Sequence, residues 1–205
     1  MQPPSLDAIA SERWLDRFQG SWLHEEIGQR MQDRLQWMRQ VPAQWLDWWP
    51  LHGGLQTHAR VRERYPQARV YLHERSPARH AQAIEALQAS WWQRVRGRDP
   101  LMSQTAPAGA MDMLWANMSL HLVADPLALL QAWHQTLAVD GFVMFSCLGP
   151  DTLRELQTLY QRRGWPPASH DFTDMHDWGD MLVGMRSWCR MCGRWRGPMT
   201  RGDWR

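Results

Sequence analysis

Hydrophobic and polar positions follow a helical period in the first part of the chain. Between residues 5 and 39, apolar side chains recur at spacings of three to five, which predicts helical structure with one apolar face, and Ser21 is a possible N-cap. Pro42 ends this pattern because proline cannot continue a helix. We interpret the apolar positions as a packing surface rather than a binding surface. They are Trp22, Ile27, Met31, Leu35 and Met38.

From residue 44 onward, short apolar runs alternate with longer amphipathic segments. The apolar runs 45–49, 69–74, 111–117 and 141–147 are predicted to be buried strands. Helices are predicted over 55–65, 77–93, 125–137 and 151–163, with a short helix capped by Thr173 and a loop or irregular edge strand at 94–110. Strand, helix and strand in succession imply parallel strands with right-handed crossovers. The expected fold class is therefore α/β, a doubly wound and mostly parallel sheet with N-terminal helices.

The length of 205 residues suits one domain with its own core. We expect residues 1–42 to be an N-terminal helical segment of that domain and residues 43–183 to be the α/β domain itself. Residues 184–205 contain six arginines and three tryptophans but no Leu, Ile or Val, so they offer no aliphatic side chains to a core. We therefore predict that 184–205 form a disordered or non-native tail.

Charge and cysteine content exclude several classes of protein. The formal net charge is +2, from 23 basic and 21 acidic side chains, which is too even for a general polyanion binder, and we do not expect nucleic acid as a partner. No apolar run reaches the ~18 residues of a membrane helix, so no membrane association and a cytoplasmic location are expected. Cys189 and Cys192 have C-x-x-C spacing, but no second ligand pair follows, so no metal site is predicted.

Ligands of doubly wound sheets bind outside the carboxyl ends of the strands, near the point where the strand order reverses. Glu74 ends the second strand about 20 residues past a Gly-Gly pair, where a carboxylate of nucleotide-binding folds accepts ribose hydroxyls. The alternative is that Glu74 faces solvent or pairs with Arg75 or Arg79. The candidate cofactor-binding residues at these strand ends are Asp47, His52, Gly53, Gly54, Glu74 and Asn117.

The loop after the first strand gives less support on its own. Its sequence, Trp49-Pro50-Leu51-His52-Gly53-Gly54, does not match G-x-G-x-x-G, and a Gly-Gly pair is common in turns. His52 remains a candidate because it lies in the expected pocket loop. His121, on an apolar stretch, is interpreted as a structural histidine.

Several segments in the second half of the chain resemble a known family. They are Met111–His121, a helix beginning at Asp125-Pro126, and the stretches 141–146, 149–156 and 172–177. Together they resemble class I S-adenosylmethionine-dependent methyltransferases, and most closely the malonyl-acyl-carrier-protein O-methyltransferase branch that starts biotin synthesis. The resemblance covers roughly residues 29–183 and is strongest from Met111 onward.

The resemblance implies a function and roles for three residues. The function is methyl transfer from S-adenosylmethionine, the cofactor, to a malonyl thioester on acyl carrier protein or to a small-molecule thioester. Glu74 stands where the family's ribose-binding acid stands, Asn117 ends the strand whose tip faces the methyl donor, and Asp47 lies close to the family's motif acid. No catalytic residue is assigned, because a carboxylate can attack a sulfonium methyl without a general base and positioning is then the main contribution.

The chain departs from the family's pattern in two places. Tryptophan, proline and histidine largely replace the glycine-rich loop, and the family's last two strands should follow residue 183, so we expect a truncated or frame-shifted C-terminus. An alternative function, favoured by Trp48-Trp49-Pro50, is a non-catalytic methyltransferase-like binding module. The enzyme hypothesis requires Glu74 and the turn around Gly53 to converge, with a hollow between them that the indoles do not fill.

Overall fold

The computed structural model describes residues 6–18, 20–88 and 106–184. The first half contains α1 (Ala8–Arg17), α2 (Trp22–Arg34), the 3-10 turn η1 (Leu35–Trp37), β1 (Gln44–Trp48), α3 (Pro50–Gly53), α4 (Leu55–Arg64), β2 (Arg69–His73) and α5 (Pro77–Gln88). The second half contains β3 (Met111–Ala116), the 3-10 turn η2 (Leu120–Leu122), α7 (Pro126–Thr136), β4 (Leu137–Phe145), α8 (Arg154–Arg163) and α9 (Met175–Gly184).

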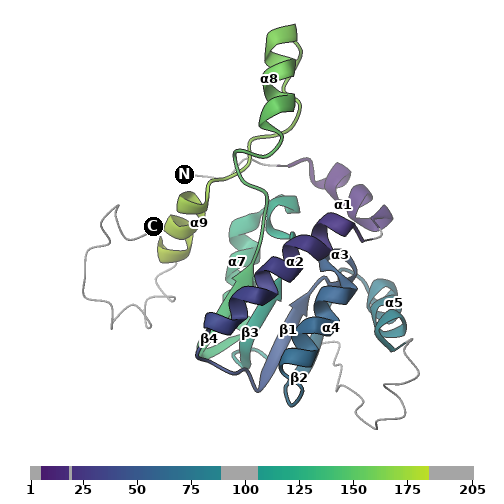
Figure 1. Cartoon of the computed structure of the whole chain (residues 1–205), viewed down its shortest axis with the longest axis vertical. Coiled ribbons are helices and arrows are strands. Elements are labelled where there is room, and N and C mark those ends of the chain that lie inside the picture. The colour runs from purple at the N-terminus through teal and green to yellow at the C-terminus, as the bar shows by residue number, and fades with distance from the viewer. Residues whose placement is uncertain (1–5, 19, 89–105, 185–205) are drawn as a thin grey trace.

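The four described strands form one parallel sheet in the order β2-β1-β3-β4 (Figure 1). β2 pairs with one edge of β1 and β3 pairs with the other, so the strand order reverses between β1 and β3. Crevices that bind ligands open at such a reversal, outside the carboxyl ends of the strands. The predicted α/β class with a mostly parallel sheet is confirmed.

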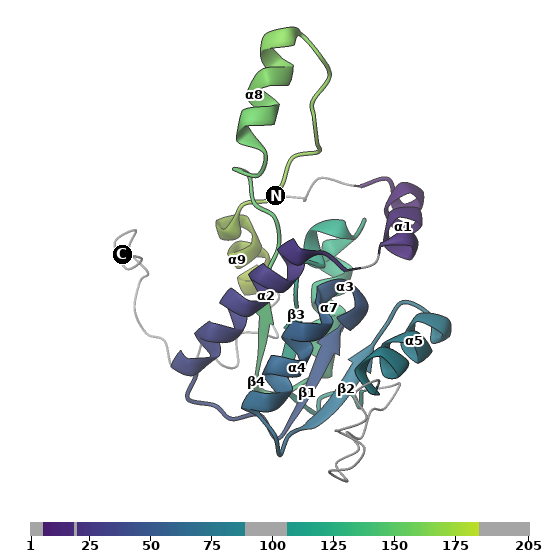
Figure 2. The ribbon, with the colours of Figure 1, turned by 45° about the vertical axis from the view of Figure 1, so that its right-hand side comes forward.

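Helices cover both faces of the sheet, as the two views of Figures 1 and 2 show. Trp45 of β1 packs in one core cluster with Val61 of α4 and residues of α2 and α5. Leu46, the next residue, packs on the opposite face with Trp133 of α7 and residues of α9. Successive side chains of a strand point to opposite faces, and here both faces are apolar, which explains the continuous apolar runs in the sequence.

The predicted helical region 5–39 is divided into α1 and α2 in the structure. Ser21 caps α2 by accepting a hydrogen bond from the backbone N–H of Leu23, as predicted. The predicted apolar face is only partly right, since Met31 is buried but Trp22 is 79% exposed. The buried face of α2 instead passes through His24 and Gly28, and a Cβ at Gly28 would clash with Oγ1 of Thr57, so the close approach of α4 requires glycine at that position.

Several elements differ from the prediction, and among them α8 begins at Arg154 rather than at residue 151. The loop after β1 contains the short helix α3, and β4 begins at Leu137 rather than at residue 141. The N-cap of α9 is Asp174, whose carboxylate accepts from the N–H of His176, so the predicted cap at Thr173 is wrong by one position. The predicted tail beyond Gly184, with Cys189 and Cys192, lies outside the described residues, as do residues 89–105.

Two further findings concern only the described part of the chain. None of its helices is long and apolar enough to cross a membrane. Within residues 6–18, 20–88 and 106–184, no group of three or more His, Cys, Asp or Glu side chains is placed to hold a metal ion.

Candidate functional site

Two strand-end residues meet the α3 turn at the carboxyl edge of the sheet. Glu74 follows β2 and accepts a hydrogen bond through Oε1 from the backbone N–H of Leu51, at 2.9 Å. Asn117 follows β3 and donates from Nδ2 to the backbone carbonyl of Gly53. Glu74 therefore contacts the turn around Gly53, as predicted, but the contact is a direct bond to Leu51, and no residue of 49–54 lines the cavity that adjoins Glu74.

The two carboxylate oxygens of Glu74 differ in their hydrogen bonding, since Oε1 accepts one bond and Oε2 accepts none among the described residues. Its side chain is fully buried, so the alternative in which it faces solvent is wrong. Oε2 forms an ion pair with Nε of Arg79 at 3.5 Å, so the predicted alternative of pairing with Arg79 is confirmed, and Oε2 has no hydrogen-bond partner among the described residues. Burial raises the pKa of Glu74, while the Leu51 N–H and the Arg79 guanidinium oppose that rise. The carboxylate is thus a buried acceptor with unused capacity.

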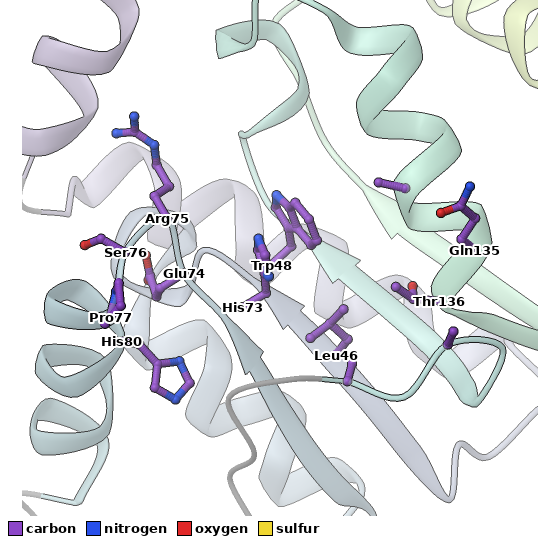
Figure 3. Close-up of a pocket in the computed structure, with 13 residues that line it drawn as sticks. Leu46, Trp48, His73, Glu74, Arg75, Ser76, Pro77, His80, Gln135 and Thr136 are labelled. Carbon is purple, nitrogen blue, oxygen red and sulfur yellow. The ribbon is translucent and has the colours of Figure 1, made fainter.

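A cavity of about 530 Å³ adjoins this carboxylate, within the range typical of small-molecule sites (Figure 3). Trp48 and His73, at paired positions on β1 and β2, form one wall, and their rings are stacked with centroids 3.7 Å apart. Ser76 and Pro77, at the start of α5, lie beside Glu74, and Thr136 at the end of α7 lies across the opening in Figure 3.

This combination of groups suits a nucleoside. An ionised carboxylate accepts hydrogen bonds from neighbouring hydroxyls, and the free Oε2 of Glu74 is available for that role. The paired rings of Trp48 and His73 offer an aromatic surface to a heterocyclic base. A ribose hydroxyl would supply the hydrogen bond that Oε2 of Glu74 lacks, so the residues present fit the adenosyl group of the expected cofactor.

Asp47 lies on the opposite face of β1 from the cavity. Its carboxylate is 2.6 Å from Nδ1 of His58 on α4, and both side chains are buried. Burial raises the pKa of Asp47, and the hydrogen bond and charge of His58 oppose the rise. Asp47 therefore joins β1 to α4 and does not line the cavity.

His52 is buried in an aromatic cluster next to the cavity wall. Its Nε2 donates to the carbonyl of Met118 at 2.9 Å, and its ring contacts those of Phe18 and His24. Burial lowers the pKa of His52 to about 3, so the imidazole is neutral at physiological pH. Nδ1 has no partner among the described residues.

The remaining candidates, Gly53, Gly54 and Asn117, hold the loop in place. A Cβ at Gly54, where φ is +118°, would meet the carboxylate of Glu25 at 2.7 Å, so a side chain there is excluded. Asn117 is fully bonded, since Nδ2 also donates to the carbonyl of His24 at 2.7 Å and Oδ1 accepts from the hydroxyl of Ser146 at 2.6 Å. Of the six candidates, Glu74 is the one that lines this cavity.

Glu25 is a residue of the site region that sequence reasoning missed. Its carboxylate accepts from the backbone N–H groups of Gln56 at 3.0 Å and Thr57 at 2.8 Å, and from the Thr57 hydroxyl. Glu25 thereby caps the amino end of α4, where unpaired amides and the helix dipole favour a negative charge. Glu25 lies in the first turn of α2, and its local sequence spacing gives no sign of a partner about thirty positions away.

Comparison with known proteins gives sequence relatives of one kind, although no family model matches the chain. A malonyl-[acyl-carrier protein] O-methyltransferase of Laribacter hongkongensis (strain HLHK9) is 36% identical over 173 residues, covering 78% of this chain and 56% of the relative. The protein of the same name from Gallionella capsiferriformans (strain ES-2) is 35% identical over 181 residues, covering 78% and 57%. The chain thus spans just over half the length of these curated relatives.

Solved structures agree at the level of the fold. The plantazolicin methyltransferase BpumL, in complex with a pentazolic desmethylPZN analog and SAH, matches with a TM-score of 0.53 at 13% identity, over 87% of this chain and 68% of BpumL. At that identity the likeness shows the fold alone. The chain is therefore a sequence relative of the malonyl-[acyl-carrier protein] O-methyltransferases, built on the fold of class I S-adenosylmethionine-dependent methyltransferases.

Proposed function

We propose that this chain transfers a methyl group from S-adenosylmethionine to the free carboxylate of a malonyl thioester on acyl carrier protein, in biotin synthesis. The observation that carries the proposal is the 36% identity over 173 residues to a protein of that activity. The parallel sheet supports it, because the buried Glu74 carboxylate lies at the carboxyl edge of the sheet and borders a cavity.

Three side chains are assigned to binding of the donor. Oε2 of Glu74 accepts from the ribose hydroxyls, and the stacked rings of Trp48 and His73 hold the adenine. The donor, when bound, supplies an electrophilic methyl group on a sulfonium. The bonds from Asn117 to Gly53 and from the Leu51 N–H to Glu74 position the α3 turn next to the Glu74 carboxylate.

Little acid–base chemistry is required of the chain. A malonyl carboxylate is already ionised at neutral pH and can attack the methyl group directly, so the protein contributes orientation and exclusion of water. His52 is given no proton-transfer role, because it does not line the cavity and its Nε2 donates to the carbonyl of Met118.

The alternative is a non-catalytic binding module, favoured in the sequence by Trp48-Trp49-Pro50. It would be supported if the indoles of Trp48 and Trp49 filled the space next to Glu74. Trp48 instead lines the cavity, and Trp49 packs in the core with the Arg75 guanidinium 5.8 Å from its ring. The described residues therefore give that alternative no support.

The test is a methyl-transfer assay on the purified chain with S-adenosylmethionine and malonyl-acyl carrier protein, read by mass spectrometry of the thioester. We expect a methyl ester of the malonyl group. Acetyl-acyl carrier protein is the control, because it lacks the free carboxylate and should remain unchanged. Absence of product from folded chain at saturating donor would contradict the proposal.

A further inference from the structure

Helix α8 stands away from the rest of the molecule. It follows β4, projects beyond the carboxyl end of the sheet in both views of Figures 1 and 2, and has no buried residue. The chain returns from α8 to α9, so both ends of this excursion are attached to the body. Helix α8 therefore lies beyond the same end of the sheet as Glu74, which follows the last residue of β2.

One face of α8 is apolar although nothing in the described chain covers it. Leu156, Leu159, Tyr160 and Arg163 recur at i, i+3, i+4 and i+7 and so share a face. Leu159 is 46% exposed, and Trp165, which follows the helix, is 52% exposed. Exposed apolar side chains gathered on one helix face are typical of an interaction surface.

The carboxyl-terminal half of this surface is basic. Arg162 and Arg163 are both exposed, and no acidic residue occurs from Leu156 to Trp165. Trp165 packs edge-on against Tyr160 with centroids 5.2 Å apart, and the Arg163 guanidinium lies 5.8 Å from the Trp165 ring. Among the described residues, no carboxylate forms an ion pair with either arginine. The surface therefore presents two uncompensated positive charges beside apolar side chains.

We propose that this surface, formed by Leu156, Leu159, Tyr160, Arg162 and Arg163, docks an acidic face of the acyl carrier protein that bears the substrate. The inference rests on the proposed function, in which the malonyl group arrives attached to a protein. Arginine recognises carboxylates with charge-assisted hydrogen bonds, and apolar contacts inside a charged rim are the usual anatomy of a protein interface. Docking at α8 brings the carrier to the end of the sheet at which Glu74 lies.

A charge-reversed variant tests the docking surface. In Arg162→Glu/Arg163→Glu, the folded body should be unaffected because α8 buries no side chain. We expect the KM for malonyl-acyl carrier protein to rise about tenfold, since reversed rim charges repel an acidic partner, while activity on malonyl-coenzyme A stays unchanged. Arg39→Glu/Arg69→Glu is the matched control: both arginines are exposed, they flank the amino ends of β1 and β2, and neither substrate should be affected.

Equal KM values for the carrier-borne substrate in the parent and the α8 variant would overturn the docking proposal. If the parent chain methylates neither substrate, the proposed function fails, and fluorescence anisotropy with labelled malonyl-acyl carrier protein still tests docking through loss of binding in the α8 variant. The variant Leu159→Ser distinguishes the carrier from other partners that could cover this face of α8. A fall in its thermal midpoint without loss of carrier binding would assign the face to another segment of this chain, and loss of self-association would assign it to a second copy; both results would overturn the proposal.

Discussion

The carboxylate of Glu74 and the backbone N–H of Leu51 are joined by a hydrogen bond of 2.9 Å. The bond ties the end of β2 to the α3 turn that follows β1, across 23 positions of sequence. It uses Oε1 and leaves Oε2 without a hydrogen-bond partner among the described residues, next to the cavity. The same side chain therefore fixes the loop and offers an acceptor to a ligand.

The raised pKa of Glu74 predicts that ionisation of its side chain lowers the free energy of unfolding. Because burial raises the folded-state pKa, the contribution of Glu74 to stability is present below its unfolded pKa and is lost as pH rises through the folded pKa. Glu74→Gln has no such charge. The free energy of unfolding of this variant, relative to the parent, should rise between pH about 4 and 7 in urea titrations. A relative decrease over that range would mean that Arg79 stabilises the carboxylate more than burial destabilises it.

Two histidines, the buried His52 and the half-buried His121, should make the protein sensitive to acid. Burial lowers the pKa of His52 and that of His121 to about 3 each, below the unfolded value, so their stabilising contribution is complete above the unfolded pKa and is lost as pH falls. The free energy of unfolding should decrease from pH 6.5 to 4 by up to about 1.4 kcal/mol per pH unit for each histidine. His52→Gln should reduce this slope and His176→Gln, at an exposed position, should not. An unchanged slope in His52→Gln would contradict the assignment.

Substitution of Asn117 should lower the free energy of unfolding more than substitution at most other polar positions. Asn117→Ala removes two donated hydrogen bonds and one accepted bond, and it takes a buried donor away from the carbonyls of His24 and Gly53. We expect a loss of about 3 kcal/mol in the free energy of unfolding by urea denaturation. Gln40→Ala also removes an amide-to-carbonyl bond, to Asp140, but at an exposed site, and should cost less than about 0.5 kcal/mol. Similar losses in both variants would show that the Asn117 network is not cooperative.

Trp49 adopts a left-handed backbone conformation, with φ at +61°, at the point where β1 turns into α3. This conformation costs a residue with a side chain roughly 1–2 kcal/mol, whereas glycine adopts it freely. Both truncations remove the buried indole, but Trp49→Gly should be about 1 kcal/mol more stable than Trp49→Ala. At Trp45, in regular strand, the order should be reversed. If thermal unfolding ranks the glycine and alanine variants in the same order of stability at both positions, backbone strain at Trp49 is excluded.

Much of the fold could be predicted from the sequence because β1, β2 and β3 are apolar on both faces. Trp45 and Leu46, adjacent in β1, are both buried, which produces the continuous apolar run that marked the strand. Glu74 and Asn117 could be placed at one edge for the same reason, since parallel strands end together. Their assignment to the cofactor stays a prediction.

The structural details that the sequence did not predict depend on contacts between segments far apart in the chain. The bond from Thr57 to Glu25 forms because α2 packs against α4, and no local pattern specifies that pairing. Helix α3 begins where Trp49 takes an unusual backbone conformation, which the loop sequence did not reveal. Trp22 was assigned to a buried face by spacing alone, yet the packing partner of α2 lies on the side of His24.

Calorimetric titration with S-adenosylhomocysteine tests the central claim most directly, because it measures the adenosyl site without requiring turnover. The parent chain should bind with a micromolar Kd, Glu74→Ala should weaken binding at least about tenfold, and Glu85→Ala, on the exposed side of α5, should bind as the parent does. Absence of binding to the folded parent at millimolar ligand, or equal affinity in Glu74→Ala, would contradict the account.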